Sequence, residues 1–159
     1  MRSWFEADKR GLQKLLAKRG LQHVLYELLS NAWDTGATTV TAELQPVTGR
    51  AAAYLVVEDD DPTGFSNLAH SWTLFAESNR KADVSKRGRF NLGEKLVLAC
   101  CDHAEIATTT GTVVFDDDGR HEHPRRKRQR GSRFSATIPM TRAQIDEVLA
   151  AARLLICPP

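Results

Sequence analysis

The stretch Glu27-Leu28-Leu29-Ser30-Asn31-Ala32-Trp33-Asp34 carries an apolar and a polar pattern at the same time. Glu27, Asn31 and Asp34 stand at i, i+4 and i+7, which places all three on one face of a helix. The leucines and the alanine between them face the core, so the polar groups lie at its edge. An unpartnered carboxylate there is costly, and a bound ligand would compensate for it. The other interpretation is an ordinary exposed helix face, and the spacing alone leaves both open.

The segments around this stretch have clear periodicities. Apolar residues recur at helical spacing over residues 12–33 with a break near Gly20, which predicts two consecutive helices. The second helix is expected to end at Gly36 in the left-handed C-cap conformation. Two β-rich runs, residues 39–44 and 52–58, then predict a hairpin.

The rest of the chain alternates helical and strand-like segments. We predict a helix over 68–76, a polar mobile loop over 77–89, a helix opened by Gly93, strands over 104–110, 112–115 and 132–138, and a last helix over 141–155. With an N-terminal helix at about 7–19, this order predicts an α+β two-layer sandwich.

Length and composition narrow the function classes. With 159 residues, 42% of them hydrophobic, the chain is expected to form a single domain over 1–159. The 22 basic and 20 acidic residues nearly cancel, which excludes a surface that is basic throughout. The sequence has neither an apolar run of about 18 residues nor a signal peptide, so we expect a cytoplasmic protein without membrane contact. Its three cysteines indicate small buried hydrophobes rather than disulfides or zinc ligands.

A second candidate site follows the strand predicted at 52–58. Asp59, Asp60 and Asp61 end this strand, and the turn residues Pro62-Thr63-Gly64 come next. A carboxylate at a strand end can accept a hydrogen bond from the amino group of a flat ligand, and a glycine lets the backbone approach that ligand. A solvated turn is the alternative.

A third candidate is the loop Lys86-Arg87-Gly88-Arg89-Phe90-Asn91-Leu92-Gly93, which leads into a helix. Free amide donors and the positive end of the helix dipole make such a helix start suitable for phosphate. It is not a Walker A loop, because Glu94-Lys95 stands where a Lys-Ser/Thr pair would be needed.

The basic segment 120–130 has the sequence Arg-His-Glu-His-Pro-Arg-Arg-Lys-Arg-Gln-Arg and lies between two predicted strands. It is interpreted either as a solvated hairpin loop or as a patch that contacts the phosphates of a nucleic acid.

Together and in this order, these motifs resemble the GHKL ATPases, the family of gyrase, the heat-shock chaperones, histidine kinases and MutL. Residues 27–38 resemble the N-box of MutL, and residues 88–93 resemble the glycine box of the chaperones. Residues 130–137 are similar to the strand that carries a Gly-Thr pair beside the adenine. The resemblance spans about residues 20–150 and implies the Bergerat fold, with a mixed, mostly antiparallel sheet and helices on one face.

The resemblance implies roles for single residues. Glu27 matches the general base that deprotonates the attacking water, Asn31 matches the Mg²⁺ ligand, and Asp34 supports the site from the same helix. Asp60 matches the acceptor of the adenine amino group, and Gly64 matches the glycine that lets the backbone approach the base. Because three aspartates are adjacent, the register could slip by one; counting back from Gly64 selects Asp60.

The resemblance also implies a lid over the triphosphate, formed by about residues 77–92. Ser132 stands where the family has a threonine that assists the aspartate through water. The other residues implied in nucleotide binding are Lys81, Gly88, Phe90, Leu92, Gly93 and Lys95, with Lys86 a further candidate cation. Two residues depart from the family pattern: Pro62 replaces the first glycine of Asp-x-Gly-x-Gly, and Asn91 replaces a glycine of the loop.

The implied function is a slow, Mg²⁺-dependent ATPase that binds ATP and ADP, in which lid closure switches a partner surface or a homodimer. DNA processing or chaperone-like action would be its setting, with a DNA or protein client at the basic segment. The alternatives are a nucleotide-binding interaction module with little turnover and a kinase of the histidine-kinase class. Family ATPases of the MutL, gyrase and chaperone types carry a further domain that supplies a lysine to the γ-phosphate, and residues 154–159 are expected to begin a linker.

Overall fold

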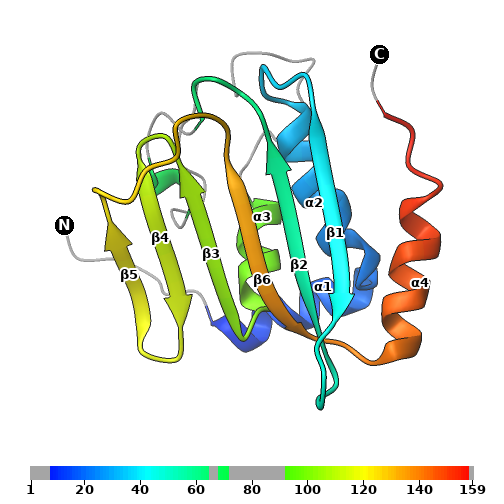
Figure 1. Cartoon of the computed structure of the whole chain (residues 1–159). Helices are drawn as coiled ribbons and strands as arrows, with labels where there is room; N and C mark the ends of the chain where they lie inside the picture. The colour runs from blue at the N-terminus through cyan, green and yellow to red at the C-terminus, as the bar shows by residue number, and fades with distance from the viewer. Residues whose placement is uncertain (1–7, 65–67, 72–91, 158–159) are drawn as a thin grey trace.

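The structure, a computed structural model, describes residues 8–64, 68–71 and 92–157 (Figure 1). In chain order its elements are α1 (Lys9–Arg19), α2 (Gln22–Trp33), β1 (Val40–Pro46), β2 (Ala52–Asp59), the short 3₁₀ helix η1 (Leu68–Ser71), α3 (Leu92–Ala99), β3 (His103–Thr108), β4 (Gly111–Asp116), β5 (Gly119–His123), β6 (Arg133–Pro139) and α4 (Arg142–Ala152). This order confirms the predicted α+β class.

The strands form one six-stranded sheet in the order β1-β2-β6-β3-β4-β5. Every pairing between these strands is antiparallel, so the part of the sheet that the structure describes lacks the parallel pair of a mixed sheet. β6 comes last in the chain but lies between β2 and β3, and it runs antiparallel to β2. The start of β6 therefore adjoins the end of β2, which brings Asp59 and Ser132, 73 positions apart in the sequence, to the same end of the sheet.

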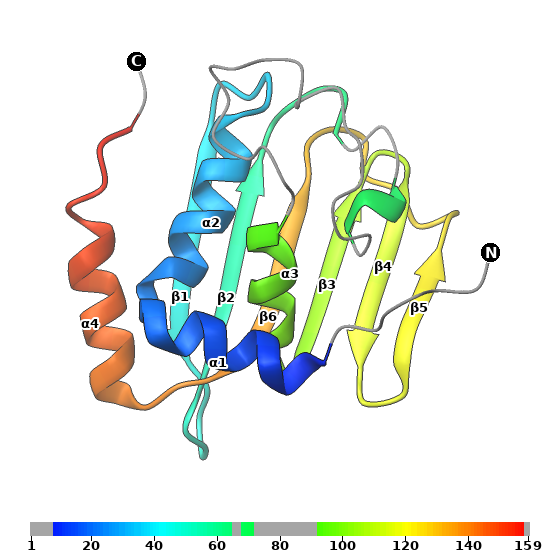
Figure 2. The same cartoon turned by 180° about the vertical axis from the view of Figure 1, so that it is seen from behind.

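Three helices cover one face of the sheet, as predicted. Figure 2 shows α1, α2 and α3 on this face, whereas α4 lies beside the edge strand β1 and contacts α2. One stripe of α2 meets the inward-facing side chains of β2, β3 and β6, and these buried residues are Val24, Leu25, Leu28, Leu29, Ala32, Ala53, Leu55, Val57, Ala104, Ile106, Phe134, Ala136 and Ile138. Apolar residues recur about every 3.6 positions along the helix and every second position along the strands, and together they form one apolar layer between the helix and the sheet. No helix of the described part lies on the other sheet face (Figures 1 and 2).

The two glycines predicted to end helices behave differently. Gly20 closes α1 with a φ of 95°, which confirms the predicted break between the first two helices. The prediction for Gly36 is wrong, because its φ is not positive. The end of α2 is instead fastened by the hydroxyl of Thr35, which donates to the carbonyl of Ala32 (2.7 Å), while the N–H of Gly36 donates to the carboxylate of Asp61 (3.0 Å).

The strand β5 (Gly119–His123) overlaps the start of the basic segment 120–130, so the interpretation of this part as a loop is wrong. Its residues Gly119-Arg120-His121-Glu122-His123 include no apolar side chain, and all of them are exposed. β5 pairs with β4 alone and lies at the edge of the sheet. An edge strand without a buried face leaves no hydrophobic alternation in the sequence to reveal it.

Other predictions are tested only in part. Of the helix predicted over 68–76, the described residues are those of η1. The predicted lid lies outside the described residues, except for Leu92, which begins α3 close to the predicted helix start. All three cysteines are free, and Cys101 is buried while Cys157 is exposed. Within the described ranges, no helix is long and apolar enough to cross a membrane.

The hairpin between β1 and β2 turns at Thr48-Gly49, where Gly49 has a φ of 81°. A Cβ at Gly49 would meet no other atom within 4 Å. In Figure 1 this turn extends beyond the sheet at the end opposite to the one where β2 finishes.

Candidate functional site

A pocket opens between α2 and the sheet, where β2 finishes and β6 begins. Four elements line this pocket. The lining residues are Leu28, Asn31 and Ala32 of α2, Thr35 just after α2, Val57 and Asp59 of β2, Ile106 of β3, and Ser132, Arg133 and Phe134 at the start of β6. Apolar side chains thus form much of the wall, with a few polar groups between them. This combination is typical of a site that binds a small molecule.

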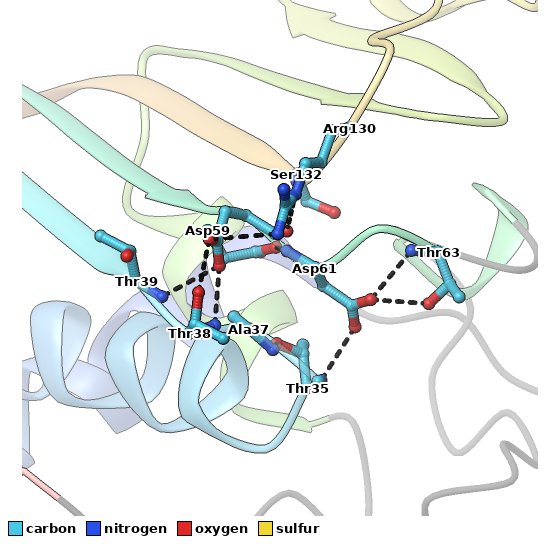
Figure 3. A network of polar contacts seen from close by, with 11 residues as sticks. Thr35, Ala37, Thr38, Thr39, Asp59, Asp61, Thr63, Arg130 and Ser132 are labelled. Carbon is cyan, nitrogen blue, oxygen red and sulfur yellow. Dashed lines mark hydrogen bonds and ion pairs between the residues drawn. The ribbon is translucent and has the colours of Figure 1, made fainter.

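Asp59 is the last residue of the inward-facing row of β2. Its side chain follows Leu55 and Val57 on the buried side of the strand, and only 9% of the residue is exposed. The Oδ1 atom of Asp59 accepts hydrogen bonds from the N–H groups of Asp61 (3.0 Å) and Ser132 (3.3 Å), which Figure 3 shows from close by. These two donors fix the orientation of the carboxylate at the pocket.

The next residue, Asp60, has different partners. Its Oδ1 accepts hydrogen bonds from the N–H groups of Thr38 (2.7 Å) and Thr39 (2.9 Å), and its Oδ2 accepts one from the Thr38 hydroxyl (2.8 Å). These contacts, with the Thr39 N–H the largest contribution, lower the pKa of Asp60 from 3.8 to about 2. The sequence predicts Asp60 at the ligand, whereas the structure engages it with the connection after α2, and Asp59 lines the pocket.

Asp61 organises the turn that follows β2. Its Oδ1 accepts hydrogen bonds from the N–H (2.9 Å) and the hydroxyl (2.8 Å) of Thr63, and its Oδ2 accepts the one from Gly36. The carbonyl of Asp61 accepts from the N–H of Gly64 (3.3 Å), which closes a four-residue turn. Pro62 occupies the second position of this turn, where proline is favoured. The departure from the family pattern at Pro62 is therefore compatible with the local backbone.

Gly64 lets this turn pass close to the end of β3. Its φ is 58°, and a Cβ there would come within 2.6 Å of the Thr108 hydroxyl oxygen and 2.7 Å of the Thr109 hydroxyl oxygen. The Thr109 hydroxyl also donates to the carbonyl of Thr63 (2.7 Å). The sequence predicts Gly64 beside the ligand, whereas in the described structure it contacts β3 and does not line the pocket.

Gly131 brings the chain before β6 against the end of β2. Its φ is 71°, and a Cβ at this position would collide with the carbonyl oxygen of Asp59. The N–H of Gly131 donates to the carbonyl of Asp61 (2.8 Å), and the hydroxyl of Ser132 lies 3.5 Å from that of the buried Thr108. Ser132 thus lies beside the aspartate that faces the pocket.

The polar face of α2 is divided between the pocket and its surroundings. Asn31 lines the pocket, while Glu27 is half-buried one turn earlier on the same face and is not part of the lining. Asp34 follows the last residue of α2 as its C-cap, and its N–H donates to the carbonyl of Ser30 (3.1 Å). The structure therefore brings Asn31 and Asp59 to one pocket from different elements.

The predicted phosphate-binding residues are only partly described. Lys81, Lys86, Gly88 and Phe90 lie outside the described residues. Leu92, Gly93 and Lys95 belong to the first turns of α3, which packs against α2. The helix start that the sequence predicts is therefore present beside α2, and its role toward phosphate stays a prediction.

Among the residues that line the pocket, sequence reasoning selected only Asn31 and Ser132. It missed Asp59, and also Thr108, whose hydroxyl lies beside that of Ser132. Asp59 has a signal in the sequence, because Ala53, Leu55 and Val57 alternate along a buried strand face and Asp59 is the next residue of that series. Thr108 has no comparable signal, since a buried hydroxyl at a strand end looks like any other β-branched core residue.

The structure is thus an α+β domain with a pocket between a helix and one end of an antiparallel sheet. The family model described as "Histidine kinase-, DNA gyrase B-, and HSP90-like ATPase" matches residues 17–142. The chain belongs to this family, which the resemblance of its sequence motifs also indicates.

Among solved structures, the chain is similar to the ATPase region of Saccharomyces cerevisiae topoisomerase II, with a TM-score of 0.55 and 16% sequence identity. The match covers 84% of this chain and 43% of that one, so the chain spans less than half of that structure. At this identity the likeness concerns the fold alone. No curated protein sequence matches the chain.

Proposed function

We propose that this domain binds ATP together with Mg²⁺ in the pocket between α2 and the sheet and hydrolyses the nucleotide slowly. The observation that carries the proposal is that Asn31 and Asp59 line the same pocket, one from α2 and the other from β2. An amide oxygen suits a hard cation, and a carboxylate suits an amino group. Membership of an ATPase family supports ATP as the ligand.

Asp59 is the proposed acceptor for the amino group of adenine, in place of the Asp60 that the family pattern selects. Two observations support this choice: Asp59 lines the pocket, and Asp60 is bonded to Thr38 and Thr39. The flat base would lie among the apolar walls, with Ser132 beside the carboxylate. An adenine amino group donating to an ionised, oriented carboxylate forms a charge-assisted hydrogen bond.

Asn31 is the proposed protein ligand of Mg²⁺. The described residues contain no group of three or more His, Cys, Asp or Glu that could hold a metal without help. A single protein oxygen at the pocket fits Mg²⁺, which is commonly held by few protein groups and by waters and substrate phosphates. When bound, the ion would neutralise charge on the phosphates.

Glu27 is the proposed general base. It lies one turn before Asn31 on the same face of α2, so a triphosphate that runs from the adenine past Asn31 would bring its last phosphate toward Glu27. Glu27 would accept a proton from the attacking water as the oxygen bonds to the γ-phosphorus and the bond to the leaving ADP breaks. Lys81, Lys95 and the Gly88–Gly93 loop remain the predicted partners of the phosphates.

The proposed consequence of binding is closure of the lid at about 77–92, which would switch a partner surface or a homodimer. Slow hydrolysis then resets the switch, so the rate of hydrolysis sets how long the closed state lasts. A nucleotide-binding module without turnover is the alternative, and retention of Glu27 on the pocket-side face of α2 favours hydrolysis.

Calorimetric titration of ATP and ADP, with and without Mg²⁺, tests the proposal. We expect ATP to bind more tightly with Mg²⁺ than without it, and the Asp59→Ala variant to bind neither nucleotide at wild-type affinity. Failure of the wild-type protein to bind adenine nucleotides at millimolar concentration would overturn the proposal. Single-turnover phosphate release then separates the ATPase from the binding module, because the latter releases no phosphate in either the wild type or a Glu27 variant.

A further inference from the structure

The second half of the basic segment, residues 124–130, folds back onto the face of the sheet that lacks helices; we call it the arginine strap. Arg126 contacts the carboxylate of Glu105 (2.9 Å), Arg128 that of Glu58, and Arg130 that of Asp60 (3.4 Å). Three cations that appear available in the sequence are thus paired with carboxylates of the same chain. This pairing partly neutralises the charge of the segment, while the side chains of Arg126 and Arg130 stay 61% and 58% exposed, so a contact with nucleic-acid phosphates stays a prediction.

Successive basic side chains of the arginine strap point alternately toward the sheet and toward solvent, as they do in an extended strand. The arginines with even numbers reach the sheet, while Arg125 and Lys127 between them are exposed and form no ion pair with any described residue. Backbone contacts hold the same segment: the N–H of Arg128 donates to the carbonyl of Thr108 (2.9 Å), and the Thr112 hydroxyl donates to the carbonyl of Arg126 (2.6 Å). The strap therefore has a defined path that ends at Gly131.

Arg130 is the last residue of the strap and lies next to the pocket wall. Its Nε donates to the carbonyl of Asp60, and its terminal nitrogen faces the carboxylate of the same residue. The following residues, Gly131 and Ser132, contact the backbone of Asp59 and Asp61. Arg130, Gly131 and Ser132 thus all contact the chain at the end of β2, and Figure 3 shows Arg130 and Ser132 beside Asp59 and Asp61.

Asp60 passes this contact on to α2. The carboxylate that faces Arg130 also accepts three hydrogen bonds from Thr38 and Thr39, in the connection that follows α2. The side chain of Asp60 therefore joins the end of β2 to the arginine strap and to the connection after α2. A shift of Arg130 would change the constraint on Asp60 and hence the backbone that orients Asp59.

We propose that Arg130 is a positioning residue for base recognition, acting through Asp60 and through Gly131-Ser132 on the carboxylate of Asp59. This inference rests on the proposed function, because it assigns the base to Asp59. Arg130 does not touch the nucleotide in this scheme. Its contribution is to hold the acceptor in place, which affects the choice between bases more than the binding of phosphates.

Inosine triphosphate (ITP) is a probe that isolates this contribution. It carries the same triphosphate as ATP but has a 6-oxo group where adenine has its amino group, so the ratio of the ITP and ATP dissociation constants reports the contact with Asp59. Effects on the phosphate end cancel in this ratio. A loss of overall stability alone would weaken both nucleotides together.

The experiment compares Arg130→Ala with Arg125→Ala, which removes an exposed arginine of the same strap. We expect the ITP-to-ATP ratio to fall about three- to tenfold in Arg130→Ala, since part of a charge-assisted hydrogen bond is lost, and to stay unchanged in Arg125→Ala. Arg130→Lys, which keeps the charge near Asp60, should recover part of the ratio. An Arg130→Ala ratio equal to that of the wild type would overturn the inference.

A salt titration of the wild-type protein covers the case in which Arg130→Ala does not fold. The side chains of Arg130 and Asp60 are 58% and 31% exposed, so salt screens their attraction. We expect the wild-type ITP-to-ATP ratio to decrease between 0.05 and 1 M salt, a roughly twentyfold rise in ionic strength that shortens the Debye length about four- to fivefold. A constant ratio would contradict the inference, whereas a wild type that does not prefer ATP over ITP would instead contradict the proposed function.

Discussion

Asp59 and Ser132 hold each other by two hydrogen bonds: the N–H of Asp59 donates to the carbonyl of Ser132 (3.0 Å), and the N–H of Ser132 donates to Oδ1 of Asp59 (3.3 Å). The first bond extends the pairing of β2 with β6, and the second orients a side chain at the pocket. The same strand pairing that stabilises the sheet therefore also sets the direction of the carboxylate.

Asp59→Asn should change the preference between bases. The asparagine oxygen is expected to keep the two N–H donors that Oδ1 accepts, which turns the NH₂ group toward the remaining position. An NH₂ group there would oppose the adenine amino group and suit the 6-oxo group of ITP. We expect ATP affinity to fall about 10- to 100-fold, with ITP affected less, as measured by calorimetry.

The matched control for this change is Asp60→Asn, one position along the chain. It should lower the preference for ATP over ITP less than Asp59→Asn does, because Asp60 is engaged with Thr38 and Thr39 and affects the base only through Asp59. A complete loss of the preference in Asp60→Asn, with none in Asp59→Asn, would restore the assignment by the family pattern.

Glu27→Ala should slow hydrolysis while leaving binding nearly intact. A general base typically contributes about 10²- to 10⁴-fold to a rate, so single-turnover phosphate release should fall by that factor. Glu147→Ala, an exposed carboxylate on α4, is the control. Equal phosphate release by the wild type and Glu27→Ala would contradict the role of Glu27.

Asn31→Ala should remove the dependence of ATP affinity on Mg²⁺. The variant lacks the amide oxygen proposed as ligand, so the dissociation constants with and without Mg²⁺ are expected to approach each other. ATP binding in the absence of Mg²⁺ should stay close to that of the wild type. A Mg²⁺ effect of wild-type size in Asn31→Ala would show that another group holds the ion.

The pKa of Asp60 predicts a pH dependence of stability in acid. The pKa in the folded state is about 2, below the ordinary value of 3.8, so folding favours the ionised carboxylate. This contribution is fully present above about pH 5 and is lost as the pH falls from about 4 to 2. Urea unfolding of the wild type and Asp60→Asn over this range should show the steeper loss in the wild type; parallel curves would mean that Asp60 is not involved.

Gly131→Ala should destabilise the fold more than Gly49→Ala. Both glycines have similar positive φ angles, 71° and 81°, but a Cβ at Gly131 would collide with the Asp59 carbonyl, whereas one at Gly49 would meet open space. The shared conformational cost is about 1 kcal/mol, and the collision should add about 1–3 kcal/mol at Gly131. Comparison of the free energies of unfolding in urea separates the two effects.

The sequence predicts the framework of the site well because periodicity carries it. The break at Gly20, the hairpin before Asp59 and the helix that presents Asn31 all follow from local patterns of apolar residues and turn formers. The choice among three adjacent aspartates does not follow from the motif, because counting from Gly64 assumes the family's turn. Here the turn from Asp61 to Gly64 contains Pro62, and the alternation along β2 decides instead that Asp59 faces inward.

The contact of the basic segment with the sheet could not be predicted from the residues of the segment itself. Its arginines look like a solvated or nucleic-acid-binding patch until the partners on β2 and β3, such as Glu58 and Glu105, are placed under them. Those contacts join residues far apart in the sequence, and nothing local encodes them. The same limit applies at position 131, where a glycine is required because a Cβ would collide with a carbonyl on another strand.

The Thr48-Gly49 turn is a suitable position for attaching a label to this domain. It lies beyond the far end of β2 from Asp59, and the eight residues of this extended strand alone span about 23 Å. Because a side chain at Gly49 meets only solvent, a cysteine placed beside it could carry a fluorophore or a surface tether. Nucleotide-driven movements could then be followed in single molecules without a label near the pocket.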